Sequence, residues 1–150
     1  MHYWLMKSEP GSFSIDDLRR CKIEPWDGVR NYQARNMLRA EMQKGDLAFL
    51  YHSSCDTPGI AGIMEIVRGG YPDATAFDPE NHHFDPASDP DRPRWFVVDV
   101  KYQRKLRRMI ALAELRGHRG LQRMKLLQKG NRLSITPVTK TEWDYILGLE

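Results

Sequence analysis

Short apolar runs separated by turn residues are the feature that most limits how this chain can fold. Pro and Gly recur between the runs, which span residues 2–7, 47–52, 60–67, 95–100 and 133–138. Runs of this length predict strands rather than helices. They do not alternate regularly with helical segments, as a doubly wound parallel sheet would require. The sequence therefore predicts an α+β fold, and 150 residues suffice for one domain with a sizeable core.

Capping residues mark where short helices should begin. Ser14, Asn31 and Thr139 each precede a segment with helical spacing of apolar residues, and such side chains satisfy the first backbone amides of a helix. These caps predict helices over 15–21 and 32–40, and a closing helix after Thr139 that contains Trp143, Ile146 and Leu147. Further short helices are expected around 111–128, after a strand that begins at Trp95 and continues through Met109.

A Pro-rich acidic loop interrupts the predicted strands between residues 72 and 94. This stretch holds five of the nine prolines and six acidic residues, a composition that does not favour a regular element. A loop of this length is either ordered by its own packing or mobile, and it could act as a lid. No linker or repeat divides the chain, so residues 1–150 are predicted to form a single domain.

Positive charge is concentrated in one segment. Residues 101–132 contain 11 Lys or Arg and one acid, Glu114, a net charge of +10, whereas the other 118 residues carry 12 basic and 19 acidic side chains, or −7. Clustered cations suit a polyanion, because each neutralised phosphate releases counterions. A solvated helix face is an equally good interpretation of the charge alone.

Several functional classes lack a sequence signal. The chain shows neither a signal peptide nor an apolar stretch long enough to span a membrane, so a cytoplasmic protein is expected. Cys21 and Cys55 are expected to be free thiols. The phosphate-binding and dinucleotide-binding glycine motifs are missing, so no cofactor is expected. His82 and His83 match no zinc-binding spacing, so we expect solvated loop residues and no metal.

Polar and aromatic residues gather at predicted strand ends. Three loops, at 7–9, 26–32 and 51–54, combine aromatic faces in Trp26, Tyr32 and Tyr51 with hydrogen-bonding groups. This combination can hold a base extruded from a nucleic acid, by stacking and by hydrogen bonds to its edges. Each aromatic residue taken singly is more typical of the core than of a base-binding pocket.

A catalytic interpretation of the same loops is the alternative. His52 lies three residues before Cys55, and Ser53 and Glu9 could complete a set of nucleophile, base and orienting group. The segment lacks the Gly-x-Ser-x-Gly elbow and every other acyl-transfer signature. We therefore predict no catalytic residues as the main hypothesis.

Six groups of residues, in order along the chain, resemble motifs of the EVE domain family, and the match runs from residue 3 to about 147. The groups are Trp4–Pro10, Trp26–Asn36, Tyr51–Ser53, Pro58–Gly62, Pro93–Trp95 with Val98–Val100, and Arg132–Ser134 with Pro137–Val138. The resemblance implies a PUA-like fold, a twisted mixed β-barrel flanked by short helices and related to the YTH and ASCH domains.

The resemblance also implies a non-enzymatic reader of DNA or RNA that carries a modified base. Trp26 with Tyr32 or Tyr51 would stack on the flipped base, and other polar side chains would bond its edges. The base pocket expected from the motifs and loops together contains Lys7, Ser8, Trp26, Val29, Asn31, Tyr32, Tyr51, His52 and Ser53. Which modification is read, and whether DNA, RNA or a free nucleoside carries it, stays open.

Charge suggests which side chains contact phosphates. The expected contacts are Arg30, Arg35, Lys101, Arg104, Lys105, Arg107, Arg108 and Arg132. Two other functions remain as alternatives. One is an ASCH-like hydrolase of a modified nucleoside that uses Lys7, Glu9 and His52, and the other is a protein-binding adaptor that uses the acidic loop. A monomer is favoured, because no heptad pattern is exposed.

Overall fold

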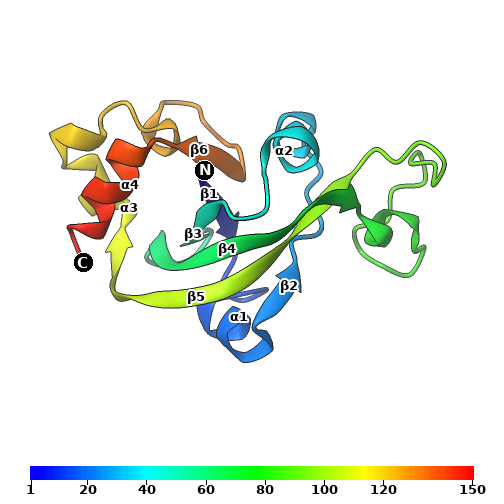
Figure 1. Ribbon diagram of the computed structural model, residues 1–150, viewed down its shortest axis with the longest axis horizontal. Helices are drawn as coiled ribbons and strands as arrows, with labels where there is room; N and C mark the ends of the chain where they lie inside the picture. The colour runs from blue at the N-terminus through cyan, green and yellow to red at the C-terminus, as the bar shows by residue number, and fades with distance from the viewer.

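A six-stranded mixed sheet organises the computed structural model, which describes residues 1–150 (Figure 1). The strand order is β2-β5-β4-β3-β1-β6, and only β1 and β3 run parallel. The strands are β1 (Tyr3–Ser8), β2 (Ile23–Pro25), β3 (Leu47–His52), β4 (Gly59–Pro72), β5 (Phe96–Ala111) and β6 (Ile135–Val138). The expected α+β class is confirmed.

Two apolar cores lie on opposite faces of the sheet, because successive side chains of a strand point to opposite sides. Trp4 and Met6 of β1 join Leu50 of β3 in the first core, whereas Leu5 and Phe49 belong to the second. Both faces are therefore covered, which explains why the central strands are apolar throughout rather than alternating.

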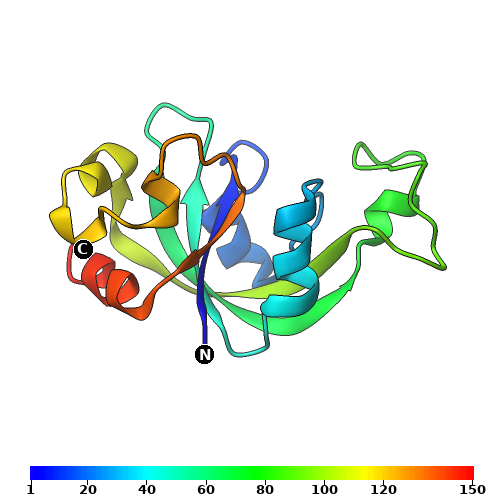
Figure 2. The same ribbon diagram turned by 90° about the horizontal axis from the view of Figure 1, so that it is seen from above.

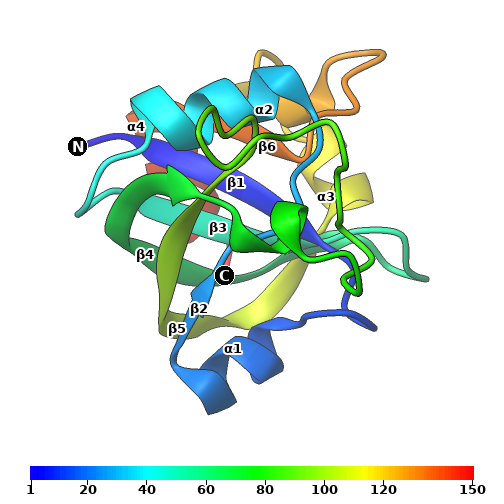
Figure 3. The same cartoon turned by 90° about the vertical axis from the view of Figure 1, so that its right-hand side faces the viewer.

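Helices from different parts of the chain cover the two faces. The first core is covered by α1 (Ile15–Cys21), α2 (Tyr32–Asn36) and the π-helical turn Met37–Glu41 that continues α2. Figure 3 shows α2 across β1, with α1 beside β2 and β5. The second core is covered by α3 (Leu112–Arg116), two short 3₁₀ turns and α4 (Lys140–Leu147).

The predicted helix starts are confirmed. The Ser14 side chain accepts from the backbone N–H of Asp17, and the Asp17 carboxylate accepts from that of Ser14, which completes a capping box. Thr139 and Glu142 form the same arrangement at the start of α4. Each pair satisfies backbone donors that the helix itself leaves free.

The sheet curls but does not close into the expected barrel. The long strands β4 and β5 pair with several register shifts, and such bulges increase the local bend and twist. The edge strands β2 and β6 do not pair with each other. Each edge strand contains a proline, Pro25 and Pro137, and proline lacks the amide that a further ladder would need.

The acidic loop leaves the sheet between β4 and β5 and forms one end of the molecule, as Figures 1 and 2 show. Its backbone is ordered by its own hydrogen bonds: the Asp73 N–H donates to the Trp95 carbonyl, and the Asp85 N–H donates to that of Ala76. A 3₁₀ turn, Ala74–Phe77, is its regular element. No helix of the chain is both long and apolar enough to span a membrane.

Candidate nucleic-acid interface

A cavity of about 510 Å³ opens at the end of β1 that carries Lys7 and Ser8. This volume lies within the range typical of small-molecule sites. Four parts of the chain form its walls: the turn after β1, the segment that follows β2, two histidines of the acidic loop, and Ser134 just before β6. The cavity therefore joins segments that lie as far as 127 positions apart in the sequence, from Lys7 to Ser134.

Four of the nine expected pocket residues line this cavity: Lys7, Ser8, Trp26 and Val29. The Ser8 hydroxyl donates to the Phe13 carbonyl at 2.7 Å, which fixes the turn after β1. Burial lowers the pKa of the Lys7 ammonium group, whose Nζ lies 5.9 Å from the centre of the Tyr51 ring.

Trp26 supplies the aromatic wall. The residue is 8% exposed, and its ring meets that of Phe13 edge-on, with ring centres 6.4 Å apart. Its backbone N–H donates to the Val98 carbonyl, which holds the residue against β5. The indole N–H groups of Trp4 and Trp95 are bonded to carboxylates, at Asp46 and Asp85. The indole N–H of Trp26 makes no such bond and is free to donate to a ligand.

Asn31 and Tyr32 lie outside the cavity lining, contrary to expectation. The Asn31 side chain accepts from the Ala34 N–H at 3.0 Å and caps α2. Tyr32, 53% exposed, stacks on Trp95 with ring centres 5.0 Å apart. Both residues sit at a helix start, where capping and the first turn direct their side chains away from the cavity.

The three expected residues at the end of β3 are also outside the lining. Tyr51 is buried in the second core, and burial raises its pKa. The Nε2 atom of His52 accepts from the Ile15 N–H at 3.1 Å, and burial lowers the pKa of this imidazole. The Ser53 N–H donates to the Ser8 carbonyl at 3.0 Å. Tyr51 and Ser53 contact the cavity residues Lys7 and Ser8 but do not line the cavity themselves.

Several cavity residues were missed by the sequence reasoning. Glu24 and Asp27 add two carboxylates to that of Glu9, which the sequence suggested only in the catalytic alternatives, and His82 and His83 reach the lining from the acidic loop, where solvated side chains were expected. Desolvation and the nearby Asp73 carboxylate raise the pKa of Asp27. The Asp27-Gly28 pair indicated only a turn in the sequence, and no local pattern places His83 beside it.

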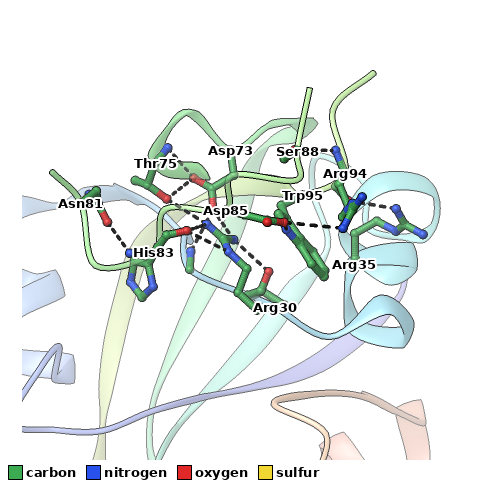
Figure 4. A network of polar contacts seen from close by, with 12 residues as sticks. Arg30, Arg35, Asp73, Thr75, Asn81, His83, Asp85, Ser88, Arg94 and Trp95 are labelled. Atoms are coloured by element: carbon green, nitrogen blue, oxygen red, sulfur yellow. Dashed lines mark hydrogen bonds and ion pairs between the residues drawn. The ribbon is translucent and has the colours of Figure 1, made fainter. Parts of the chain in front are cut away.

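Arg30 also lines the cavity, but its guanidinium group is held by the acidic loop (Figure 4). Nη1 lies 3.0 Å from the Asp73 carboxylate, and Nη2 donates to the His83 carbonyl at 2.6 Å. Burial opposes ionisation of Asp73, but hydrogen bonds from Thr75, Gly28 and Arg30 lower its pKa overall. Arg30 thus joins the loop to the cavity wall, and its guanidinium group is not available to bind a phosphate unless these contacts break.

Most of the other expected phosphate contacts are occupied within the chain. The Arg35 Nη1 group donates to the Arg94 carbonyl at 2.9 Å. Three cations of β5 form ion pairs: Arg104 with Glu150, Lys105 with Asp16, and Arg108 with Glu114. The side chains of the remaining three are exposed and form no ion pair: Lys101, Arg107 and Arg132.

The structure does not assemble the catalytic set considered from the sequence. The Nε2 atom of His52 accepts from the Ile15 N–H at the start of α1, so this atom is not available as the base of a catalytic triad. No group of three or more His, Cys, Asp or Glu side chains is placed to hold a metal ion. What the cavity presents is an aromatic wall, a partly buried lysine and several carboxylate acceptors.

Comparisons with known proteins agree with this architecture. A crystal structure from Pseudomonas putida has 52% identity, covers 98% of both chains and superposes with a TM-score of 0.94. The crystal structure of human THYN1 protein in complex with DNA containing 5-methylcytosine has 46% identity and a TM-score of 0.94, and covers 99% of this chain and 97% of that one. An ASCH protein from Zymomonas mobilis, 11% identical with a TM-score of 0.58, is similar in fold alone.

Sequence comparison agrees with the structural comparison. Human thymocyte nuclear protein 1 is 48% identical over 166 residues, which cover 99% of this chain and 73% of that protein. A family model described as the EVE domain matches residues 2–149. The chain therefore belongs to the EVE domain family.

Proposed function

We propose that this chain binds DNA that carries a modified base and holds the base, turned out of the duplex, in the cavity beside Trp26. One observation carries the proposal: the cavity combines an aromatic wall with hydrogen-bonding groups, in a chain 46% identical to a protein crystallised with DNA containing 5-methylcytosine. A base outside the duplex needs both features, because stacking replaces its lost neighbours and edge contacts identify it.

The chemistry of the lining favours a base that carries an amino group, such as cytosine. Carboxylates such as that of Asp27 accept hydrogen bonds from the exocyclic amino group of cytosine. Thymine presents a carbonyl oxygen at the same position, which a carboxylate repels. Val29 and Trp26 add apolar surface that can contact a methyl group on the ring. Asp27 is therefore the residue assigned to base identity.

A binding role is favoured over the hydrolase alternative. The hydrolase hypothesis required Lys7, Glu9 and His52 to act together, but only Lys7 and Glu9 line the cavity. His52 is bonded to the backbone of α1 instead. Incubation of excess protein with 5-methyl-2′-deoxycytidine should leave the nucleoside intact, and any product would favour the hydrolase.

The proposal is tested by titrating labelled duplexes that differ only in one base: 5-methylcytosine, cytosine or thymine. Trp26→Phe should weaken binding of the modified duplex more than that of the unmodified one. Asp27→Asn should reduce the preference for cytosine over thymine by about 5- to 150-fold, since one good base-edge contact contributes about 1–3 kcal/mol. Matching RNA oligonucleotides establish which nucleic acid is preferred.

Equal affinity of the wild-type protein for all three duplexes would overturn the proposal. Urea unfolding of each variant separates loss of contact from loss of fold, because Trp26 also belongs to the first core. Asp27 belongs to neither core, so Asp27→Asn is the cleaner of the two variants.

A further inference from the structure

We call the cavity lined by Lys7, Ser8 and Trp26 the base cavity. Its two sides differ in charge. On one side lies the acidic loop, in which residues 73–94 carry six acids and two arginines. On the other side lies Ser134, which belongs to a segment, residues 115–141, with seven Lys or Arg and no acid. Figures 1 and 2 show the acidic loop at one end of the molecule and the segment from α3 to α4 at the other.

Part of the basic segment runs between two cavities. Arg123 and Lys125 line a second cavity, of about 560 Å³, together with His2 and Tyr3 at the opposite end of β1. From there the chain passes through Lys129 and Arg132 and reaches the base cavity at Ser134. We call Arg123, Lys125, Lys129 and Arg132 the cationic track.

The four charges of the track are free. All four residues are exposed, and their side chains form no ion pair and no hydrogen bond within the chain. Three cations of β5 instead form ion pairs with Glu150, Asp16 and Glu114. A phosphate can therefore be bound by the track without breaking an existing pair, whereas Arg104, Lys105 or Arg108 would first have to lose its partner.

The backbone that carries the track is held in place. Leu121, Met124 and Leu126 are buried in the second core. The Gln128 side chain donates to the Gln122 and Met124 carbonyls, at 3.0 and 3.1 Å. The Asn131 side chain donates to the Lys125 carbonyl and accepts from the Leu133 N–H. The cations thus extend from an ordered segment, which lowers the entropy lost when they bind.

The span of the track suits a nucleic-acid backbone. The two cavities lie at opposite ends of β1, whose six residues extend about 20 Å at about 3.3 Å each. One strand of B-DNA places a phosphate every 3.4 Å along the axis. The track therefore runs alongside roughly five or six phosphates, enough for each of its four cations to meet one.

We propose that the cationic track binds the DNA backbone on the β6 side of the base cavity, so that the duplex extends away from the acidic loop. The inference rests on the proposed function, because it assumes that DNA is the ligand. It assigns the electrostatic part of binding to residues 123–132 rather than to the cations of β5. The acidic loop, with its net charge of −4, reinforces this direction by repelling phosphates.

The test is the salt dependence of duplex binding. Two double variants, Arg123→Gln with Lys125→Gln and Lys129→Gln with Arg132→Gln, should each reduce the slope of log K against log salt by about 2, since one phosphate contact contributes about 0.9. The preference for the modified base should not change. The matched control, Arg19→Gln with Lys44→Gln, removes two exposed and unpaired cations on other elements and should leave the slope unchanged.

The competing surface is tested by Lys101→Gln with Arg107→Gln. A reduced slope in this pair and an unchanged slope in both track variants would overturn the inference, as would slopes unchanged in all three. Failure of the proposed function has a different signature: the wild-type protein would then show no preference for a modified base, whatever the track variants do.

Discussion

The Asp73 carboxylate lies 3.0 Å from Nη1 of Arg30, across 43 positions of sequence, and fastens the acidic loop to the wall of the base cavity. The same carboxylate accepts from the Gly28 N–H and from both donors of Thr75. We expect Asp73→Asn to reduce the free energy of unfolding by roughly 2–3 kcal/mol, because it leaves the Arg30 charge without its partner. Urea unfolding measures this loss.

The difference between wild type and Asp73→Asn should depend on pH in a defined way. The pKa of Asp73 is lowered in the folded protein, so its contribution is fully present above about pH 4, near the unfolded value. It is lost as the pH falls through the folded pKa. Asp91→Asn, at an exposed position of the same loop, is the control and should unfold like wild type at all pH values. An Asp73→Asn effect that does not shrink as the pH falls below 4 would contradict the ion-pair account.

His52 should make stability depend on pH near neutrality. Its Nε2 accepts from the Ile15 N–H, which requires the neutral ring, and burial lowers its pKa. Folded protein then binds a proton less readily than unfolded protein, so the contribution of His52 is present above about pH 6.5 and is lost as the pH falls below it. In His52→Gln, an amide oxygen can replace the acceptor but does not titrate.

The measurement is the free energy of unfolding at pH 7.5 and pH 5.5 in both proteins. Wild type should lose more stability on acidification than His52→Gln. His83, whose pKa is also lowered, is present in both proteins, so its contribution cancels in the comparison. Identical losses would show that His52 does not titrate with folding.

Gly28 combines a left-handed backbone with a close neighbour. Its φ is +78°, and a Cβ atom there would lie 2.5 Å from the His83 ring. Gly28→Ala should therefore destabilise the fold by more than the roughly 1–2 kcal/mol of the backbone strain alone, and should move His83 at the cavity. Gly130→Ala is the matched stability control, because φ is +79° with nothing within 4 Å. Equal destabilisation of the two variants would exclude a steric role for His83.

Tyr32 tests the boundary of the binding site. Its ring stacks on Trp95, and the guanidinium carbon of Arg35 lies 5.0 Å from the ring centre. Tyr32→Ala should cost about 1 kcal/mol of stability through the lost stacking. The preference for a modified base should remain, because Tyr32 does not line the cavity. Tyr32→Phe keeps the stack and should match wild type in both measurements; loss of base preference in Tyr32→Ala would place this ring in the site.

Features that depend on neighbouring residues were predicted correctly from the sequence. The caps at Ser14, Asn31 and Thr139 act between residues three apart, so their partners are visible within one turn of chain. The strand at Leu47–His52 has the predicted bounds, because a short apolar run between turns has few other ways to fold. Trp26 and Val29 line the cavity because the segment from Glu24 to Arg30 forms one of its walls.

The predictions that failed concern side chains whose positions depend on partners far away in the sequence. Tyr51 belongs to the second core and His52 is held by the backbone of α1, and no local pattern distinguishes these positions from a ligand contact. Glu150 neutralises Arg104 from 46 positions away, so counting charges overstated how many cations of β5 are free. His83 was missed for the same reason, since its position depends on Asp73 and Arg30.

The parallel pairing of β1 and β3 has a consequence for how the lining of the cavity can change. Two adjacent parallel strands cannot be joined by a tight hairpin, so the chain must cross over between them. Here that crossover, residues 9–46, supplies most of the cavity wall, from Glu9 through Trp26 to Arg30. Most residues of this crossover do not pair with β1, β3 or β4. Side chains of the cavity lining can therefore be exchanged while the β1, β3 and β4 registers stay fixed, so a single scaffold can accommodate ligands of different chemistry.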